Sequence, residues 1–472
     1  MLNRMEDEDG EWAAKVKLYA NSAYMLMVAS SLLYPSLLRS VLFGLVGSEL
    51  SPVVLTWQYF TMKGLIRDHS KLVFGSWSGR LCMLLQTFSI SVVARNLLQG
   101  VFAVPRDFAN ALESVGVKPT LTGDWSPKNL MWRILALVPA FAVSRMGQNI
   151  QVKRNIPYAG LDKKMLENWK RTPSLVRNIN MLAFRGRHSN WLSLDLHHVA
   201  DGNENKPVLL YFHGGGWGMG DKSVAGLSLM TRVAARGVVV VAANYRLIPD
   251  VSIADQVRDC KRALIFVKRN CHLWGGNSAK VFVSGESAGG HLSAMLGCTA
   301  HLPSLQPSEE GDTSVAGCLP IYGVFDMTDS DGHLAEIKEK YLGVPVGVRP
   351  LVSFLGMEAP YGDDSKHLYE LISPTVQVRQ LLAKDTAPTS FPPYFISHGT
   401  LDSLASYTDA NKFYQETIKL WEKFPGQVPK PAMATVTGGV HGFGYFPSPR
   451  GNSLGDAFCD FIFHHSATLA KL

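Results

Sequence analysis

The sequence predicts an α/β protein in which helices flank a mainly parallel sheet, with a mostly helical N-terminal extension and a cap insertion. Three observations carry this prediction. Beyond about residue 180, short β-rich runs alternate with helical patterns, which is typical of parallel sheets. Before that point, long apolar stretches alternate with short polar breaks, and strand signals are few. Residues 326–390 lie between two expected strands and form a connection far longer than a usual crossover, so a cap is expected there.

Seven runs in the second part of the chain are expected to be strands. The run at 191–199 alternates apolar and polar residues and predicts a half-exposed strand, whereas the other runs are short and apolar. A helix is expected between Asp250 and Asn270, because apolar residues recur there at alternating steps of four and three and share one face. The other expected strands are 207–212, 237–247, 280–284, 316–323, 392–399 and 432–439.

These elements divide the chain into three parts: an apolar helical extension over 1–150, a linker over 151–180, and a sheet-containing domain over 181–472 with its cap at about 326–390. A length of 472 residues, 46% hydrophobic and 18% charged, accommodates one large domain and an extension. This composition excludes disordered and fibrous proteins. The formal net charge of +7 comes without a basic block or recognition motif, so no nucleic-acid partner is expected.

Cysteine usage and the termini bear on location. None of the six cysteines falls in a C-x-x-C pair or a zinc spacing, and no N-x-S/T acceptor occurs, which fits a reducing compartment and predicts no metal site. Residues 18–38 carry no charge over a bilayer-spanning length. This pattern leaves open a spanning helix, a helix lying in the membrane, or a buried helix. The apolar stretches 81–94 and 134–144 are shorter than a span.

We expect an intracellular protein associated with a membrane through its N-terminal region. The alternative is the peroxisomal matrix, because Ala470-Lys471-Leu472 is similar to the S-K-L address. The pattern does not fix the oligomeric state.

The sharpest local signal is G-E-S-A-G at residues 285–289, which follows an expected strand and precedes an expected helix. In such a turn the serine sits in a strained backbone conformation that lifts its hydroxyl clear of the sheet. Bulky neighbours two residues away would collide, so glycine stands at both Gly285 and Gly289. Ser287 is therefore the predicted nucleophile, in preference to an incidental serine in a tight turn.

A serine hydroxyl needs a base, and a base needs an orienting acid. His441, in G-G-V-H-G-F after the last expected strand, has the right place in chain order for the base. The acid should follow the preceding strand, and Asp402 in G-T-L-D-S-L does so. Asp409 and Asp385 are the weaker alternatives, since one lies farther into the next helix and the other before the strand.

Backbone donors for a developing oxyanion are predicted in H-G-G-G-W, at Gly214, Gly215 and Gly216. Glycines leave their N–H groups uncovered and allow the loop to approach a substrate carbonyl, and Ala288, directly after the nucleophile, supplies a further N–H. A glycine loop of this kind also cradles phosphates, but no G-K-[ST] follows it here.

Taken in order, H-G-G-G-W, N-Y-R-L, G-E-S-A-G-G-H, G-T-L-D-S-L and V-H-G-F resemble the hormone-sensitive-lipase-like carboxylesterase branch of the α/β-hydrolases, over about residues 180–470. The segment around the serine is similar to mycobacterial-type carboxylesterases. The resemblance implies a Ser287–His441–Asp402 triad and an oxyanion hole from Gly215, Gly216 and Ala288, with Gly214 as part of the loop. Asn244 stands where the branch often has aspartate. Some fungal and animal relatives are membrane-anchored deacetylases of lipophilic esters.

We therefore expect a cofactor-free serine hydrolase that acts through an acyl-enzyme on short to medium acyl esters of lipophilic alcohols. The same triad also serves thioesterases and amidases, so these remain open. A non-catalytic hydrolase-fold interaction protein is the alternative from another class, and it typically lacks a triad residue or the glycine loop.

Overall fold

The computed structural model describes residues 2–33, 45–120, 150–159, 192–223, 226–248, 250–328, 330, 366–446 and 448–469. Within them, an eight-stranded sheet has the order β1-β2-β4-β3-β5-β6-β7-β8. From β4 to β8 all neighbouring strands are parallel, and β2 pairs antiparallel with both β1 and β4. The strands are β1 (Ile150–Pro157), β2 (Ser193–Val199), β3 (Lys206–Phe212), β4 (Val239–Ala243), β5 (Gly276–Glu286), β6 (Gly317–Ile321), β7 (Phe395–Gly399) and β8 (Ala432–Val436).

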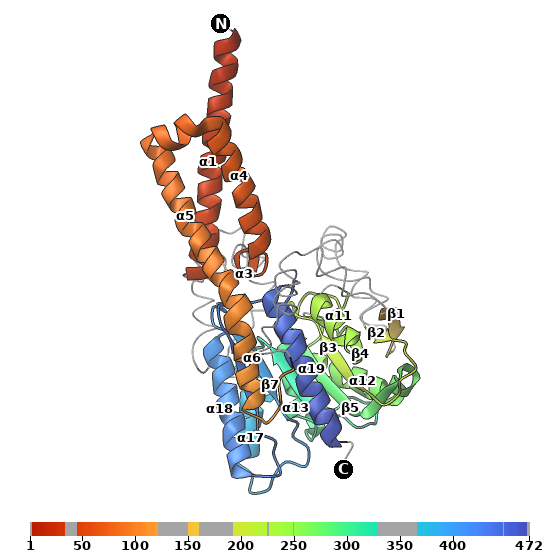
Figure 1. Ribbon diagram of the computed structural model, residues 1–472. Coiled ribbons are helices and arrows are strands. Elements are labelled where there is room, and N and C mark those ends of the chain that lie inside the picture. The colour runs from red at the N-terminus through yellow and green to blue at the C-terminus, as the bar shows by residue number, and fades with distance from the viewer. Residues whose placement is uncertain are drawn as a thin grey trace.

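Alternate residues of the central strands serve two separate cores, one on each face of the sheet (Figure 1). Val208, Leu210 and Phe212 of β3 face one core, and Leu209 and Tyr211 face the other. Because successive strand residues point to opposite faces, a strand covered on both sides must be apolar throughout. The first face is covered by α12 (Ile253–Asn270), α13 (Ala288–Cys298), α17 (Pro374–Leu382) and α18 (Tyr407–Lys423), and the second by α6 (Val104–Glu113), α11 (Leu227–Ala235) and α19 (Pro449–Leu469).

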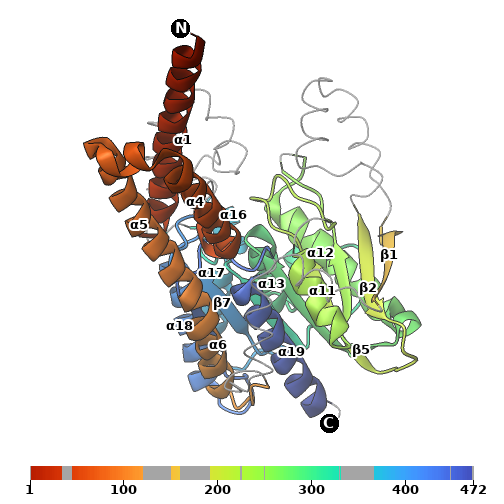
Figure 2. The same cartoon turned by 45° about the horizontal axis from the view of Figure 1, so that its top comes forward.

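Before the sheet in sequence, three long helices pack together into a bundle that projects away from the sheet (Figures 1 and 2). They are α1 (Leu2–Leu33), α4 (Ser51–Gly75) and α5 (Trp77–Leu98). The short α3 (Leu45–Glu49) lies at the base of this bundle, near the sheet domain. Helix α5 continues through a π-helical turn, η2 (Gln99–Ala103), into α6. The expected helical extension is thus observed, but its last helix belongs to the packing of the sheet domain.

The predicted fold class is confirmed, and the expected strands appear, most of them shortened at one end or both. The expected linker is corrected at its start: residues 150–157 are β1, the edge strand, which pairs with β2. Its pattern, I-Q-V-K-R-N-I-P, is mostly exposed, so it lacks the apolar run that marks a buried strand. As a consequence β2 is an interior strand, and its first five residues are buried rather than half-exposed. Residues 160–180, the rest of the expected linker, lie outside the described residues.

The expected cap is only partly described. Its end, from residue 366, forms α16 (Lys366–Leu371) and α17, and α17 packs against α13 and α18 as part of the domain. Residues 331–365 lie outside the described part of the chain, as do residues 34–38 of the uncharged segment 18–38, the stretch 134–144 and the tripeptide 470–472.

The structure shifts attention from the segment 18–38 to another helix. Within the described residues, one helix is long and apolar enough to cross a membrane, and it runs from Trp77 to Glu113. The stretch 81–94, expected to be too short for a span, is embedded in this longer helix. Arg80 and Arg95 border that stretch in the sequence. The continuous helix includes both of them, so it is longer than the uncharged stretch alone.

Candidate active site

Ser287 sits at the turn between β5 and α13 with φ 54° and ψ −118°. A positive φ is rare for a residue with a side chain, and residues strained in this way cluster at functional sites. The flanking glycines are sterically required: a Cβ at Gly289 would lie 2.1 Å from the Phe212 carbonyl oxygen, and one at Gly285 would lie 2.5 Å from the backbone of Gly289. The strained turn predicted from G-E-S-A-G is therefore present, and it presents the serine at the end of the central strand.

Three side chains predicted to act together are brought into one line of hydrogen bonds. Ser287 Oγ lies 2.9 Å from His441 Nε2, and His441 Nδ1 lies 2.9 Å from Asp402 Oδ2. Asp402 follows β7 and His441 follows β8, so neighbouring parallel strands deliver both groups to the same edge of the sheet. With Nδ1–H donating to Asp402, Nε2 is free to accept the serine proton.

The side chain of Asp402 is fully buried and is surrounded by hydrogen-bond donors of the protein. Its Oδ1 accepts from the backbone N–H groups of Leu404, at 3.0 Å, and Ala405, at 2.9 Å. Burial opposes ionisation of Asp402, but interactions with His441 and His398 outweigh it and hold the pKa of this carboxyl well below its usual value. Asp402 is thus a carboxylate at neutral pH, able to fix the imidazole and stabilise its protonated form.

The weaker alternatives for the acid lie elsewhere. Asp409 is in the first turn of α18, where its Oδ2 accepts from the Phe325 N–H at 2.6 Å. Asp385 is exposed in the segment between α17 and β7. His398 was not predicted, although its Nε2 lies 3.4 Å from Asp402 Oδ2 and 3.0 Å from the Ala405 carbonyl oxygen. Its place in F-I-S-H-G, four residues before the acid, is the signal that could have found it.

The loop after β3 lies against Ser287. A Cβ at Gly214 would lie 3.2 Å from Ser287 Cβ, and Gly215 and Gly216 have φ of 124° and 55°. Among the described residues, the N–H groups of Gly215 and Gly216 donate to no protein acceptor. Ala288 is the first residue of α13, so its N–H has no partner within the helix. These three donors are available to a substrate oxygen.

Gly214 lies against Glu286 as well as against Ser287, because a Cβ at Gly214 would lie 2.9 Å from the Glu286 carbonyl oxygen and 3.1 Å from Glu286 Cγ. Glu286 is buried, accepts from Tyr322 Oη at 3.0 Å, and has its pKa raised by burial. The Tyr322 ring in turn lies 4.9 Å from the His441 ring, centroid to centroid. Glu286, the residue before Ser287, thus links the glycine loop to the surroundings of His441, a contact that the sequence pattern did not reveal.

A second histidine, His291, supports the same loop. Trp217 Nε1 donates to His291 Nδ1 at 3.1 Å, and His291 Nε2 lies 2.7 Å from the Ile372 carbonyl oxygen. These partners fit only the neutral ring with its proton on Nε2. Burial agrees with them and lowers the pKa of His291 to about 4. Trp217, with φ 60°, is thereby fixed at the end of the glycine loop.

Asn244 stands where the resembled branch often has aspartate. Both polar atoms of its side chain form hydrogen bonds. Its Oδ1 accepts from the Lys222 N–H at 2.7 Å, and its Nδ2 donates to Asp221 Oδ2 at 2.8 Å. An aspartate here would place two carboxylates side by side, so the amide suits this neighbour. Both bonds brace the segment that follows the glycine loop.

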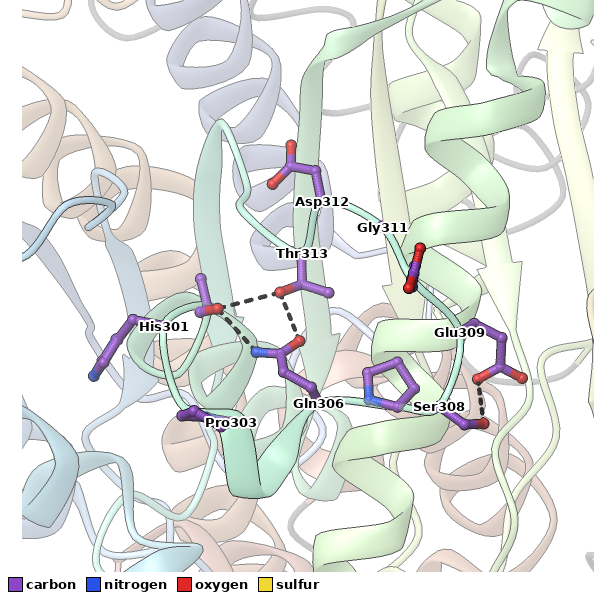
Figure 3. Close-up of a pocket in the computed structure, with 11 residues that line it drawn as sticks. His301, Pro303, Gln306, Ser308, Glu309, Gly311, Asp312 and Thr313 are labelled. Atoms are coloured by element: carbon purple, nitrogen blue, oxygen red, sulfur yellow. Dashed lines mark hydrogen bonds between the residues drawn. The ribbon is translucent and has the colours of Figure 1, made fainter.

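A surface pocket of about 480 Å³ is lined by residues 300–313, outside this site (Figure 3). These residues follow the C-terminal end of α13, whereas Ser287 lies at its N-terminal end. Some polar groups in the wall pair with each other: Gln306 donates to the Ala300 carbonyl oxygen at 2.9 Å and accepts from Thr313 at 3.0 Å. The pocket therefore has no part in the chemistry of Ser287.

Comparison with known proteins locates the similarity in the same part of the chain. The family model described as BD-FAE matches residues 194–417. A protein of Mycobacterium tuberculosis named probable carboxylic ester hydrolase LipM is 31% identical over 211 residues, covering 44% of each chain. One of Oryza sativa subsp. japonica named probable isoprenylcysteine alpha-carbonyl methylesterase ICMEL1 is 28% identical over 221 residues, covering 47% of this chain and 49% of its own.

A solved truncated carbohydrate esterase from gut microbiota has 18% identity and a TM-score of 0.48, covering 67% of this chain and 96% of its own. The chain spans about half the length of the curated relatives it matches. The family match includes the glycine loop, the serine turn and Asp402, and it leaves out the N-terminal helices and His441. Residues 194–417 are thus similar to the BD-FAE family, and much of this region is similar to proteins named as carboxylic ester hydrolases.

Proposed function

We propose that this protein is a serine carboxylic-ester hydrolase. The observation that carries the proposal is the line of hydrogen bonds from Ser287 through His441 to Asp402, with both distances 2.9 Å, beside three uncommitted backbone donors. Names of the relatives agree with ester hydrolysis. A non-catalytic interaction protein has no need of a strained serine turn whose hydroxyl already meets a base, so the arrangement favours an enzyme.

In the first half of the reaction, Ser287 Oγ attacks the ester carbonyl carbon and its proton moves to His441 Nε2. The carbonyl oxygen becomes an oxyanion that accepts from the N–H groups of Gly215, Gly216 and Ala288. Collapse of this intermediate breaks the bond to the alcohol oxygen, and the imidazolium returns its proton to the leaving alcohol. The acyl group remains on Ser287 as an ester.

In the second half, His441 takes a proton from water as that water attacks the acyl-enzyme. The same donors hold the second oxyanion, and its collapse returns the proton to Ser287 Oγ and releases the carboxylic acid. The charged Asp402 stabilises the imidazolium in both halves. Each step uses only groups of the protein, the ester and water, so the proposal includes no cofactor and no metal.

We further propose that the N-terminal helices associate with a membrane. The distribution of polar groups in the bundle supports this, because its interior holds three hydrogen-bonded amides beside its buried apolar residues: the Asn21 amide exchanges hydrogen bonds with Gln58 at 2.9 and 3.0 Å and donates to Gln86 at 3.3 Å. All three amides are buried. Its outer surface is instead apolar, with Phe60 on α4 63% exposed and Leu84 on α5 69% exposed. In water this distribution is costly, and in lipid it is favourable.

Exposed apolar residues occur on all three helices of the bundle. Lipid would therefore surround the bundle and not contact one face only. The end of α4 and the start of α5 lie toward the tip of the bundle, away from the sheet (Figure 1). These two ends carry Lys71 and Arg80, which would meet headgroups. The further exposed apolar residues are Trp12, Val16, Tyr19, Leu26, Met27, Leu33, Val53, Trp57, Tyr59, Phe74, Trp77, Leu81, Phe88, Leu98 and Phe102. An intracellular membrane is the proposed location, and the peroxisomal matrix remains the alternative.

For the substrate we propose short to medium acyl esters of lipophilic alcohols, because a membrane-associated esterase meets substrates that partition into lipid. The name of the Oryza relative favours a second arrangement, in which a small alcohol such as methanol leaves a lipophilic acid. In both arrangements the apolar part of the ester lies beside a membrane. In the first the alcohol is the apolar part, and in the second the acid is. Thioesters and amides use the same chemistry at Ser287.

An ester series on the purified full-length protein in detergent tests the proposal. We expect turnover of soluble acetate and butyrate esters that exceeds turnover of emulsified triolein. Ser287→Ala should lower it by ~10⁴-fold or more, because only the nucleophile is removed. Adding methyl esters of lipophilic acids to the series separates the two arrangements. Faster hydrolysis of triolein, or turnover that Ser287→Ala leaves unchanged, would contradict the proposal.

A further inference from the structure

The loop that carries the base is held by helices from the other end of the chain. On one side of His441, the Thr437 N–H donates to Asp107 Oδ2 at 2.9 Å, and Asn96 Nδ2 donates to the Gly438 carbonyl oxygen at 3.2 Å. On the other side, the Gly444 N–H donates to Glu49 Oε2 at 3.2 Å. We call residues 437–446 the histidine loop, and Glu49, Asn96 and Asp107 the N-terminal clamp.

A buried arginine joins the clamp to the loop. Arg450, 1% exposed, lies 3.8 Å from Glu49 and donates to the carbonyl oxygens of Asn96, at 2.9 Å, and Thr437, at 3.3 Å. Burial lowers the pKa of Arg450, and Glu49 and Asp107 oppose that shift. One guanidinium thus bonds the backbone of α5 and the backbone of the histidine loop at once, which fixes their separation.

Apolar packing also holds the histidine loop against the helical bundle. Val440, directly before His441, is fully buried in a cluster formed by residues of the bundle: Met25, Val28, Leu32, Val54 and Val93. Leu401, directly before Asp402, packs against the same cluster, and its N–H donates to the Gly439 carbonyl oxygen at 2.9 Å. The neighbours of both the base and the acid therefore rest on the base of the helical bundle.

The backbone is shaped for this close approach. Gly438 has φ 65°, and a Cβ there would lie 2.8 Å from Gln99 Oε1 and 3.0 Å from Asn96 Nδ2. Gly100, in the π-helical turn between α5 and α6, faces Arg450 in the same way, because a Cβ at Gly100 would lie 3.1 Å from the Arg450 Nη1 atom. π-helical turns are rare and occur often at functional sites. Here the turn lets one helix serve both the bundle and the sheet domain (Figure 2).

We infer that Glu49, Asn96 and Asp107 are positioning residues for the proposed esterase reaction. By holding the histidine loop on both sides, they set the place of His441 between Ser287 and Asp402. The membrane-facing bundle and the triad then form one mechanical unit, and the N-terminal helices are more than an anchor. This inference deepens the proposed function and rests on it.

The test compares two substitutions of buried amides in the same bundle, made in the full-length protein. Asn96→Leu removes the bond to the Gly438 carbonyl oxygen, while Gln58→Leu removes two hydrogen bonds to Asn21 inside the bundle, neither of which reaches the histidine loop. We expect Asn96→Leu to lower kcat for a soluble butyrate ester by about 10- to 100-fold with KM little changed, because small displacements of a catalytic group cost that much. Gln58→Leu should change kcat less than about twofold, since the triad is untouched.

Asn96→Asp serves if the leucine variant fails to fold, because it keeps the size of the side chain and replaces the donor with an acceptor facing Gly438. The rate at which a fluorophosphonate labels Ser287 is measured in parallel, and it should fall with kcat. Equal kcat losses for Asn96→Leu and Gln58→Leu, or an effect of Asn96→Leu on KM alone, would overturn the inference. If wild-type Ser287 is labelled but hydrolyses no ester, the proposed substrate fails while the labelling rates still decide the role of the clamp.

Discussion

At the scale of single residues, the environments of three aspartates support Asp402 as the proposed acid. Asp402 meets the imidazole, and Asp409 instead caps a backbone N–H of another segment. We expect Asp402→Asn to lower kcat by about 10⁴-fold, because an amide permits the wrong histidine tautomer. Asp409→Asn should leave kcat within a few-fold and reduce thermal stability instead. The two variants are compared by kcat and melting temperature, and a reversed order of the kcat effects would move the acid to Asp409.

The neutral state of His291 predicts a pH dependence of stability. Its pKa is lowered by burial to about 4 in the folded protein, so the unfolded chain binds the proton more readily. Stability is therefore complete above the unfolded pKa of about 6.5 and is lost as pH falls from there toward about 4. From pH 7 to pH 5 the loss from this group is about 2 kcal/mol.

Urea unfolding at the two pH values checks this expectation, with His291→Gln as the comparison. Glutamine can still accept from Trp217 and donate to the Ile372 carbonyl oxygen but does not titrate. The wild type should lose about 2 kcal/mol more than the variant over this range. An equal loss in both proteins would show that His291 takes up its proton without disturbing the fold.

At the scale of elements, the serine turn is the least tolerant connection. Gly289→Ala would place a methyl group 2.1 Å from the Phe212 carbonyl oxygen, so β3 and α13 must separate. We expect destabilisation by about 1–3 kcal/mol and a loss of activity of about 100-fold, measured by urea unfolding and ester turnover. Gly64→Ala is the matched control, because nothing lies within 4 Å of its Cβ position in α4. Similar effects from both substitutions would argue against a strained turn.

Local patterns made the serine turn and the central strands predictable. Gly285, Ser287 and Gly289 are close in sequence, and the steric reason for each is carried by the five-residue motif. The edge strand β1 was missed because most of its residues are exposed, and its pairing with β2 joins segments about 40 residues apart. Most of the stability of such an edge strand comes from its pairing with the neighbouring strand, so its own residues show no pattern that predicts it.

At the scale of the whole molecule, the contacts of the N-terminal clamp could not be predicted from the sequence, because they join residues that are far apart in the chain. Asn96 and Gly438 are 342 residues apart, and Glu49 and Gly444 are 395 apart. Single asparagine and glutamate residues in helices give no sign of such partners. The membrane signal was likewise placed on residues 18–38, because hydropathy along the chain does not show which apolar side chains end up on the outside of a bundle. Only the assembled structure shows hydrogen-bonded amides inside the bundle and large apolar side chains on its exterior.

Membrane association predicts a specific difference between two exposed leucines. Leu84 on α5 is 69% exposed and Leu273 on the sheet domain is 68% exposed. After a carbonate wash of membranes, wild-type protein and Leu273→Glu should stay in the pellet. Leu84→Glu combined with Phe88→Glu should shift protein to the supernatant, because charges facing lipid cost about 2–4 kcal/mol each. Release of the wild type by the wash would instead favour a soluble protein and the peroxisomal alternative.

Fluorophosphonate labelling of the full-length protein, with the modified peptide identified by mass spectrometry, decides whether Ser287 is the activated nucleophile of an esterase. We predict a single modified residue, Ser287, whose labelling is abolished by Ser287→Ala and strongly slowed by His441→Ala, with ester turnover lost in parallel. Modification of a different serine, or labelling of Ser287 that proceeds at the wild-type rate without His441, would refute the proposed nucleophile and its base.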